Sequence, residues 1–202
     1  MKYKIGIFGS AVKEGKEAQQ KAKELGQVLG NYNIDIINGA CTGIPYLVSY
    51  SAHQKGIDVY GYSPVFNFEQ QKKFTPNDDL SIYKKIYYIS KKFECSYNSD
   101  ACKKYRNVIS TANCDAGIIV SGRWGTMNEF TNLYDMGKVI GVLTGTGGIA
   151  DELAKLDKKI KKKSKAKIFF NSSPKELVDC IINELGKRQL LLQGGRLNEV
   201  KP

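Results

Sequence analysis

The segment from Ser121 to Glu129 brings glycines, a hydroxyl, a cation and a carboxylate together in a short stretch. It follows the apolar run 116–120 directly and precedes a helix-like pattern. A glycine-containing turn between a strand and a helix leaves unpaired backbone N–H groups, which bind phosphate. Glu129 is expected about one turn into that helix, where it faces the same ligand. The segment therefore predicts an anion site with a carboxylate beside it.

Two further turns follow predicted strands. Gly9 and Ser10 come after the strand 4–8, and Gly39 and Gly43 come after the strand 34–37. Each pair alone has a simpler explanation, because glycine also serves turn geometry. The carboxyl ends of parallel strands share one edge of a sheet, where such sheets bind ligands. Three such turns together predict one crevice for a nucleotide or another phosphorylated ligand.

The residue patterns of several other binding and catalytic sites are absent from the sequence. The chain has neither the G-x-G-x-x-G of ordinary dinucleotide binding nor the G-K-[ST] of a P-loop. His53 is the only histidine, which disfavours a histidine-based metal site or a catalytic triad. The five cysteines include no C-x-x-C pair and are interpreted as structural thiols. We therefore expect no metal and no cofactor.

The elements that must position these turns alternate between strand and helix patterns. Strands are predicted at 4–8, 34–37, 58–62, 82–89, 116–120, 139–143 and 167–170, and helices at 14–29, 45–56, 99–112, 124–136, 149–163 and 174–185. The helix at 99–112 is expected to be capped by Ser99 and Asp100. The stretch 65–80 is predicted to be an irregular loop. Alternation with strands apolar on both faces predicts an α/β fold, a three-layer sandwich with a mainly parallel sheet between helices.

Length and charge add limits. The 202 residues suffice for one substantial core, so we predict a single domain at 1–186 and a polar tail at 187–202. No segment is apolar enough to predict a membrane span, and a cytoplasmic protein is expected. The net charge is +11, much of it in the run 158–167. That run lacks aromatics that would stack on bases, so it is interpreted as a solvated helix end and loop, and nucleic-acid binding is not favoured.

The three turns resemble those of the LOG family, the lysine decarboxylase-like Rossmann proteins, within a wider nucleotide-binding superfamily. That family has a Gly-Ser turn after its first strand, G-G-G-x-x-G-x-M after its second and P-G-G-x-G-T-x-x-E later. The matching positions here begin at Gly9, at Asn38 and at Ser121. Arg106 lies nine residues before Asp115, the interval that separates the family's catalytic Arg from its next strand.

The resemblance implies a Rossmann-like domain and a phosphoribohydrolase reaction, the hydrolysis of a nucleoside 5′-monophosphate to free base and ribose 5-phosphate. Glu129 and Arg106 would be the catalytic residues. The nucleotide and its phosphate would be bound by Gly9, Ser10, Gly39, Gly43, Gly122, Arg123, Gly125 and Thr126. Both motifs depart from the family pattern in part. In the later motif Ser121 replaces a proline and Arg123 replaces a glycine, and in the second turn the middle is Ala40-Cys41-Thr42 and Pro45 replaces a methionine.

Alternatives remain open. Relatives with this fold bind nucleotides or a molybdenum cofactor without turnover, as carriers or sensors, and others process DNA. LOG-like proteins are homodimers, and a dimer or tetramer is expected here as well. The apolar residues available for such an interface are Tyr46, Leu47, Tyr50, Leu133 and Tyr134. Trp124 would either stack on a base or pack against the sheet.

Overall fold

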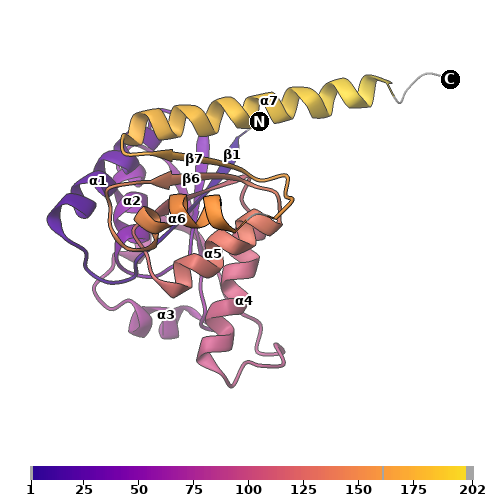
Figure 1. Ribbon diagram of the computed structural model, residues 1–202. Coiled ribbons are helices and arrows are strands. Elements are labelled where there is room, and N and C mark those ends of the chain that lie inside the picture. Colours follow the sequence, from indigo (N-terminus) through magenta and orange to yellow (C-terminus); the bar gives the residue numbers. More distant parts are fainter. Residues whose placement is uncertain (1, 161, 199–202) are drawn as a thin grey trace.

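A seven-stranded parallel sheet forms the centre of the computed structural model, which describes residues 2–160 and 162–198 (Figure 1). The strand order is β4-β3-β2-β1-β5-β6-β7, and every neighbouring pair runs parallel. The predicted α/β class and three-layer arrangement are confirmed. The sheet is parallel throughout the described residues.

The helices and strands follow the predicted alternation. The strands are β1 (Tyr3–Gly9), β2 (Ile34–Asn38), β3 (Asp58–Tyr62), β4 (Tyr83–Tyr87), β5 (Ala116–Val120), β6 (Val139–Leu143) and β7 (Lys167–Asn171). The helices are α1 (Lys16–Leu29), α2 (Ile44–His53), α3 (Phe68–Phe74), α4 (Ser99–Ala112), α5 (Trp124–Asp135), α6 (Gly148–Lys159) and α7 (Pro174–Asn198), with a 3₁₀ turn at Leu80–Ile82.

Each face of the sheet has its own hydrophobic core, because successive side chains of a strand point to opposite faces. Ile36 and Ile118 pack with α1, α2 and α7 in one cluster. Ile37 and Ile119, the next residues along the same strands, pack with α5 and α6 in the other. Burial on both faces explains why the central strands are continuous apolar runs rather than alternating ones.

The stretch 65–80 differs from its prediction as an irregular loop. It contains α3, which begins where the Asn67 side chain accepts a hydrogen bond from the Gln70 amide. Gln71 of α3 is fully buried. A further correction concerns α4, whose N-cap is Asn98 rather than Ser99 or Asp100: the Asn98 side chain accepts from the amides of residues 100 and 101.

Two helix ends also differ from prediction. The helix expected at 149–163 ends at Lys159. The described part of the basic run 158–167 is therefore a helix end, a loop and the first residue of β7, and Lys161 lies outside the described residues. The helix expected to end at Leu185 continues as α7 to Asn198 and runs past the body of the molecule (Figure 1). Residues 187–198 are therefore helical, and residues 199–202 of the predicted tail lie outside the described part.

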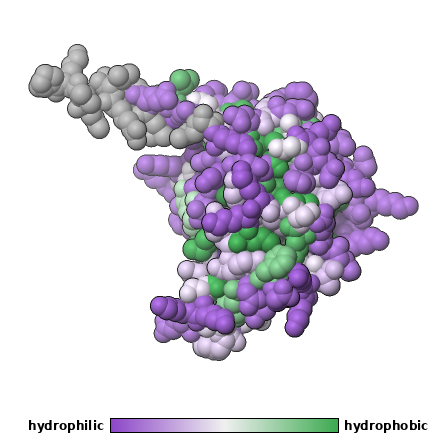
Figure 2. All heavy atoms as spheres, turned by 180° about the vertical axis from the view of Figure 1, so that it is seen from behind, coloured by the Kyte–Doolittle hydropathy of each residue, from purple (hydrophilic) through white to green (hydrophobic). Residues whose placement is uncertain are grey.

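Most of the surface seen in Figure 2 is formed by hydrophilic residues. The hydrophobic residues on this face are gathered in a smaller group. Leu133, expected at a subunit interface, is instead fully buried in the chain's own core. Among the described residues, no helix combines the length and the apolar character that crossing a bilayer requires.

The strand order reverses around β1. Its neighbours are β2 on one side and β5 on the other, and the chain builds outward from this centre in both directions. At such a switch point the loops leave the two halves of the sheet in opposite directions and open a crevice at the carboxyl ends of the strands. The three glycine-containing turns follow β1, β2 and β5, so the topology brings them to this crevice.

Candidate functional site

A cleft of about 470 Å³ opens at the carboxyl ends of β1, β2 and β5. Its volume lies in the range of small-molecule sites. Eight of the ten residues predicted for the site line it, namely Gly9, Ser10, Gly39, Arg106, Arg123, Gly125, Thr126 and Glu129. The structure thus brings together residues that lie up to 120 positions apart in the sequence.

Gly43 and Gly122, the other two predicted residues, are not among the lining residues and shape the turns instead. Both have positive φ, 84° at Gly43 and 102° at Gly122. A side chain at Gly43 would meet the backbone of Ser10 and Ala11, and one at Gly122 would meet the Thr126 side chain. These glycines are required by backbone conformation and by close packing.

Hydrogen bonds join the first two turns. The Ile44 amide donates to the Ser10 carbonyl at 2.9 Å, and the Thr42 hydroxyl donates to the Ala11 carbonyl at 2.9 Å. Ser10 itself is buried. The turn after β1 and the start of α2 therefore form one unit at the wall of the cleft.

A buried side-chain network supports the turn after β2. Ala40 has a left-handed φ of 46°, and its amide donates to the Asn38 side chain at 2.8 Å. The same side chain donates to the Ser49 hydroxyl of α2 at 2.7 Å. From α3, the Gln71 amide group donates to the Ala40 carbonyl at 2.9 Å. Both backbone groups of Ala40 are thereby satisfied, which holds a conformation that non-glycine residues rarely adopt.

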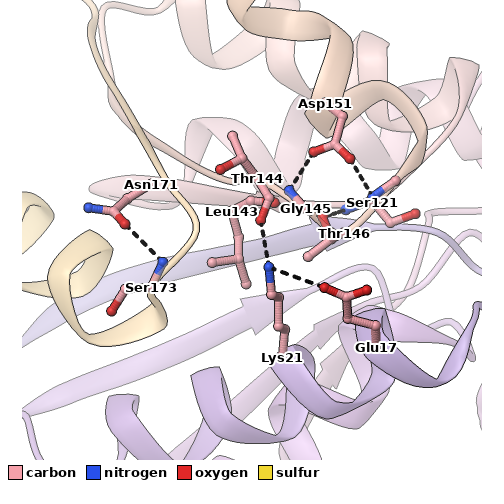
Figure 3. A network of polar contacts seen from close by, with 11 residues as sticks. Glu17, Lys21, Ser121, Leu143, Thr144, Gly145, Thr146, Asp151, Asn171 and Ser173 are labelled. Atoms are coloured by element: carbon pink, nitrogen blue, oxygen red, sulfur yellow. Dashed lines mark hydrogen bonds and ion pairs between the residues drawn. The ribbon is translucent and has the colours of Figure 1, made fainter.

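The Thr146 side chain and the first backbone amides of α6 support the turn after β5. Ser121 has a left-handed φ of 54°, and its amide donates to the Thr146 hydroxyl at 2.8 Å (Figure 3). The carbonyls of Ser121 and Gly122 accept from the amides of Ala150 and Ile149 at the start of α6, at 3.2 and 2.8 Å. With its carbonyls and the Ser121 amide bound in this way, the turn is held in place directly before α5.

The first turn of α5 supplies donors for an anion. The first intrahelical bond runs from the Met127 amide to the Arg123 carbonyl, so the amides before Met127 have no partner within the helix. Gly125 and Thr126, on this first turn, line the cleft. The positive end of the α5 dipole adds to the attraction for a phosphate.

Arg106 of α4 and Glu129 of α5 form a buried ion pair at the cleft. Arg106 Nη1 lies 3.8 Å from Glu129 Oε1, and the two residues are only 9% and 6% exposed. Burial raises the pKa of Glu129 to about 7, although the Arg106 charge opposes this rise. The Arg106 guanidinium also occupies the space that a side chain at Gly39 would fill. Gly39 is therefore needed to make room for the arginine.

The polar face of α4 is the part of the site that the sequence interpretation missed. Asp100, Lys103, Lys104 and Asn107 line the cleft beside Arg106. Their spacing of i, i+3, i+4 and i+7 is that of one helix face, and this periodicity in a predicted helix was a usable signal. With its amide turned to satisfy its neighbours, Asn107 donates to Glu129 Oε1 at 3.2 Å. The missed residues thus add both charge and support for the carboxylate.

Charge at the cleft favours an anionic ligand. Its lining includes four cationic side chains, those of Lys103, Lys104, Arg106 and Arg123, against two carboxylates. Cys41 also lines the cleft, and burial raises the pKa of its thiol, which stays protonated. Among the described residues, no group of three or more His, Cys, Asp or Glu side chains is placed to hold a metal ion.

Trp124 does not pack against the sheet. It is 83% exposed and does not line the cleft, so the packing alternative is wrong.

Comparison with protein families identifies the chain. The model of the SLOG cluster4 family matches residues 2–178. The chain belongs to this family. The expected superfamily is thus confirmed: the chain has the nucleotide-binding type of fold of the SLOG superfamily. The matching family is SLOG cluster4 and not the LOG family in particular. A search among curated proteins gives no match.

Solved structures agree on the fold. The protein TM1055 superposes with a TM-score of 0.71 at 21% identity, over 91% of this chain and 99% of that chain. The molybdenum cofactor binding protein of the phototrophic bacterium Rippkaea orientalis gives 0.66 at 17% identity, over 92% and 98%. DNA processing protein A of Helicobacter pylori gives 0.60 at 17% identity, over 90% and 81%. At these identities the likeness is one of fold.

Proposed function

We propose that the cleft binds a nucleotide, with its phosphate on the amides of Gly125 and Thr126 and its sugar beside Glu129. The single observation that carries this proposal is the junction of the α5 N-terminus with the Arg106–Glu129 pair in one cleft. Amides and cations suit the phosphate, and the carboxylate suits the sugar. Membership of a family with a nucleotide-binding type of fold supports the same ligand class.

We further propose that the cleft hydrolyses the N-glycosidic bond of a nucleoside 5′-monophosphate, as LOG proteins do. The bond breaks through an oxocarbenium-like sugar, and water then adds to the sugar carbon while the base leaves with the electron pair and takes up a proton. The Glu129 carboxylate stabilises the developing positive charge and orients the water. Arg106 holds the ligand, and Asn107 keeps the carboxylate in place. One such charge-stabilising group contributes about a hundredfold in rate.

Release of free base from AMP, GMP, CMP and UMP, followed by chromatography, tests the reaction. Glu129→Gln is expected to lower the rate by about a hundredfold or more while AMP still binds, because the amide keeps the shape but cannot carry the negative charge. Glu152→Gln is the matched control, since Glu152 lies on the α6 surface in an exposed pair with Lys155. Unchanged turnover in Glu129→Gln would contradict the proposed mechanism.

The second candidate is a carrier or sensor that holds its ligand without turnover. The excess of cations at the cleft favours it, because such a site also retains a polyanionic ligand such as a molybdenum cofactor. Its signature in the same experiment is AMP binding by calorimetry with no release of base by the wild-type protein. Absence of binding as well would contradict both candidates.

A further inference from the structure

A second cavity lies beside α4, and the nucleotide proposal does not use it. It measures about 450 Å³ and is lined by α4, by the ends of β3 and β4, the two outermost strands on that side of the sheet, by the segment after β4, and by Lys4 of β1. Its lining includes Tyr62 of β3, Tyr87 of β4 and Tyr105 of α4. Among the residues that the structure describes, Arg106 alone lines both this cavity and the nucleotide cleft.

Two stacked aromatic pairs contribute its walls. Tyr62 and Tyr87 stack with ring centroids 4.9 Å apart at 22°. Tyr105 stacks on Phe93 with centroids 4.4 Å apart at 19°. One pair comes from the sheet, and the other comes from α4 and the segment before it. Tyr87 and Tyr105 nevertheless remain 38% and 40% exposed, so part of each ring is open to a ligand. The Lys85 ammonium lies 4.6 Å from the centroid of the Tyr87 ring, so a ligand that stacks there shares the ring with this side chain or displaces it.

The charged residues of this lining are both cationic. They are Lys4 and Arg106, and the described lining contains no Asp or Glu. The other polar groups are hydroxyls and an amide, from Ser63, Ser90, Asn113 and the tyrosines. Aromatic faces with nearby positive charge and hydroxyls suit a flat ring that carries an acidic group.

We propose that this tyrosine cavity is a second ligand site, which takes a planar heteroaromatic anion by stacking its ring on Tyr87 and Tyr105 and placing its acidic group near Lys4. A single small ligand fits better than a nucleic-acid strand, because the cavity has the volume of one small-molecule site. The inference does not rest on the proposed reaction. It uses neither Glu129 nor the glycine-containing turns.

Quinoline-2-carboxylate is a suitable probe, because it has a flat bicyclic ring and a carboxylate but no phosphate and no glycosidic bond. Its affinity is measured by saturation-transfer NMR and titration on the full chain. Tyr87→Ala and Tyr105→Ala are each expected to weaken binding about tenfold, the usual effect of losing one stacking ring. Lys4→Gln is expected to lower the affinity for quinoline-2-carboxylate. Neutral quinoline is expected to bind the wild type more weakly than quinoline-2-carboxylate does.

Two controls separate stacking from folding. Tyr87→Phe keeps the ring and is expected to bind as the wild type does, which shows that binding needs the ring and not the hydroxyl. Thermal unfolding of Tyr87→Ala shows whether its loss of binding is a folding defect. Tyr97→Ala removes a tyrosine that is 87% exposed and lines neither cavity, and it is expected to have no effect.

Three results would overturn the proposal. The first is no binding of the probe to the wild type, and the second is equal binding by wild type, Tyr87→Ala and Tyr105→Ala. The third is a wild-type dimer in sedimentation that Tyr87→Ala converts to monomer, because a second copy of the chain would then cover the cavity. Since the probe lacks a phosphate, failure here leaves the nucleotide experiments unaffected.

Discussion

The turns after β2 and β5 solve the same backbone problem in different ways. Each has one non-glycine residue with left-handed φ, Ala40 at 46° and Ser121 at 54°. Side chains from α2 and α3 hold the turn after β2, through Ser49 and Gln71. The turn after β5 is held mainly by backbone amides of α6, with one side-chain contact from Thr146. The first depends on residue identity and the second on where a helix begins.

The glycines of the two turns differ as well. Gly39 needs no unusual φ, and its space is taken by the Arg106 guanidinium. Gly122 has a φ of 102° and also packs on Thr126. Gly39 therefore leaves room for the Arg106 guanidinium in the cleft, whereas Gly122 permits the backbone conformation of the turn. Substitutions separate these two requirements.

Gly39→Ala is expected to have the largest effect, on ligand binding. Its methyl group displaces the Arg106 guanidinium, so both the ligand and Glu129 lose their cation. Charge-assisted hydrogen bonds contribute about 1.5–3 kcal/mol, which corresponds to about a 10- to 100-fold loss of AMP affinity. Isothermal titration calorimetry measures it.

A double-mutant cycle with Arg106→Ala is the sharpest control for Gly39→Ala. If the methyl group acts by displacing the arginine, Gly39→Ala has no further effect on affinity once Arg106 is removed. Additive losses would instead mean that Gly39 contributes through its own backbone.

Gly122→Ala is expected to act on stability. A residue with a side chain at a φ of 102° costs about 1–3 kcal/mol, and the clash with Thr126 adds to it. Gly56→Ala is a matched control, because Gly56 has a φ of 86° but open space around the added atom. Thermal unfolding should show a greater loss for Gly122→Ala than for Gly56→Ala, and equal losses would mean that only the backbone angle matters.

The pH dependence of the stability of Glu129→Gln tests whether burial raises the pKa of the Glu129 carboxyl group. The pKa of Glu129 is about 7 in the folded chain, above the ordinary 4.5, so between these values the folded state holds a proton that the unfolded state releases. The free energy of unfolding of the wild type therefore falls as pH rises through this window. Glutamine does not titrate, so the free energy of unfolding of the variant relative to the wild type rises by on the order of 3 kcal/mol between pH 4.5 and 7.5.

Denaturant titrations at several pH values measure this difference. Glu152→Gln is again the control, since the Glu152 carboxylate is exposed. A gap between Glu129→Gln and wild type that does not change with pH would contradict the raised pKa.

The sequence predicted the strands and the three turns because both leave local signals. Continuous apolar runs mark β5 and β6, which are fully buried, and glycines mark the turns that follow strands. Arg106 was found through its interval to Asp115 in a known family pattern, since nothing local distinguishes it from a solvated arginine. The sequence did not predict α3, because its seven residues are mostly polar and are held by tertiary bonds from Gln71.

The support of the two turns was also beyond local prediction. The bonds from Gln71 to Ala40 and from Ile149 to Gly122 join segments separated by 31 and 27 positions. Neither leaves a periodic pattern in the chain. The departures at Ser121 and Arg123 could be seen in the sequence, but only the packing of α6 explains how a serine is held in a left-handed conformation at the turn.

The smallest expected effects are on stability, when glycine replaces the two residues with left-handed φ, Ala40 and Ser121. Ala40→Gly removes a conformational cost of about 1–2 kcal/mol but adds about 0.5–1 kcal/mol of chain entropy to the unfolded state, so it gains only about 0.5 kcal/mol. Ser121→Gly gains more, about 1 kcal/mol, because the buried Ser121 hydroxyl has no hydrogen-bond partner among the described residues. Thermal unfolding of the two variants measures the difference. An equal gain in both would show that the Ser121 hydroxyl is satisfied in solution, for example by a bound water.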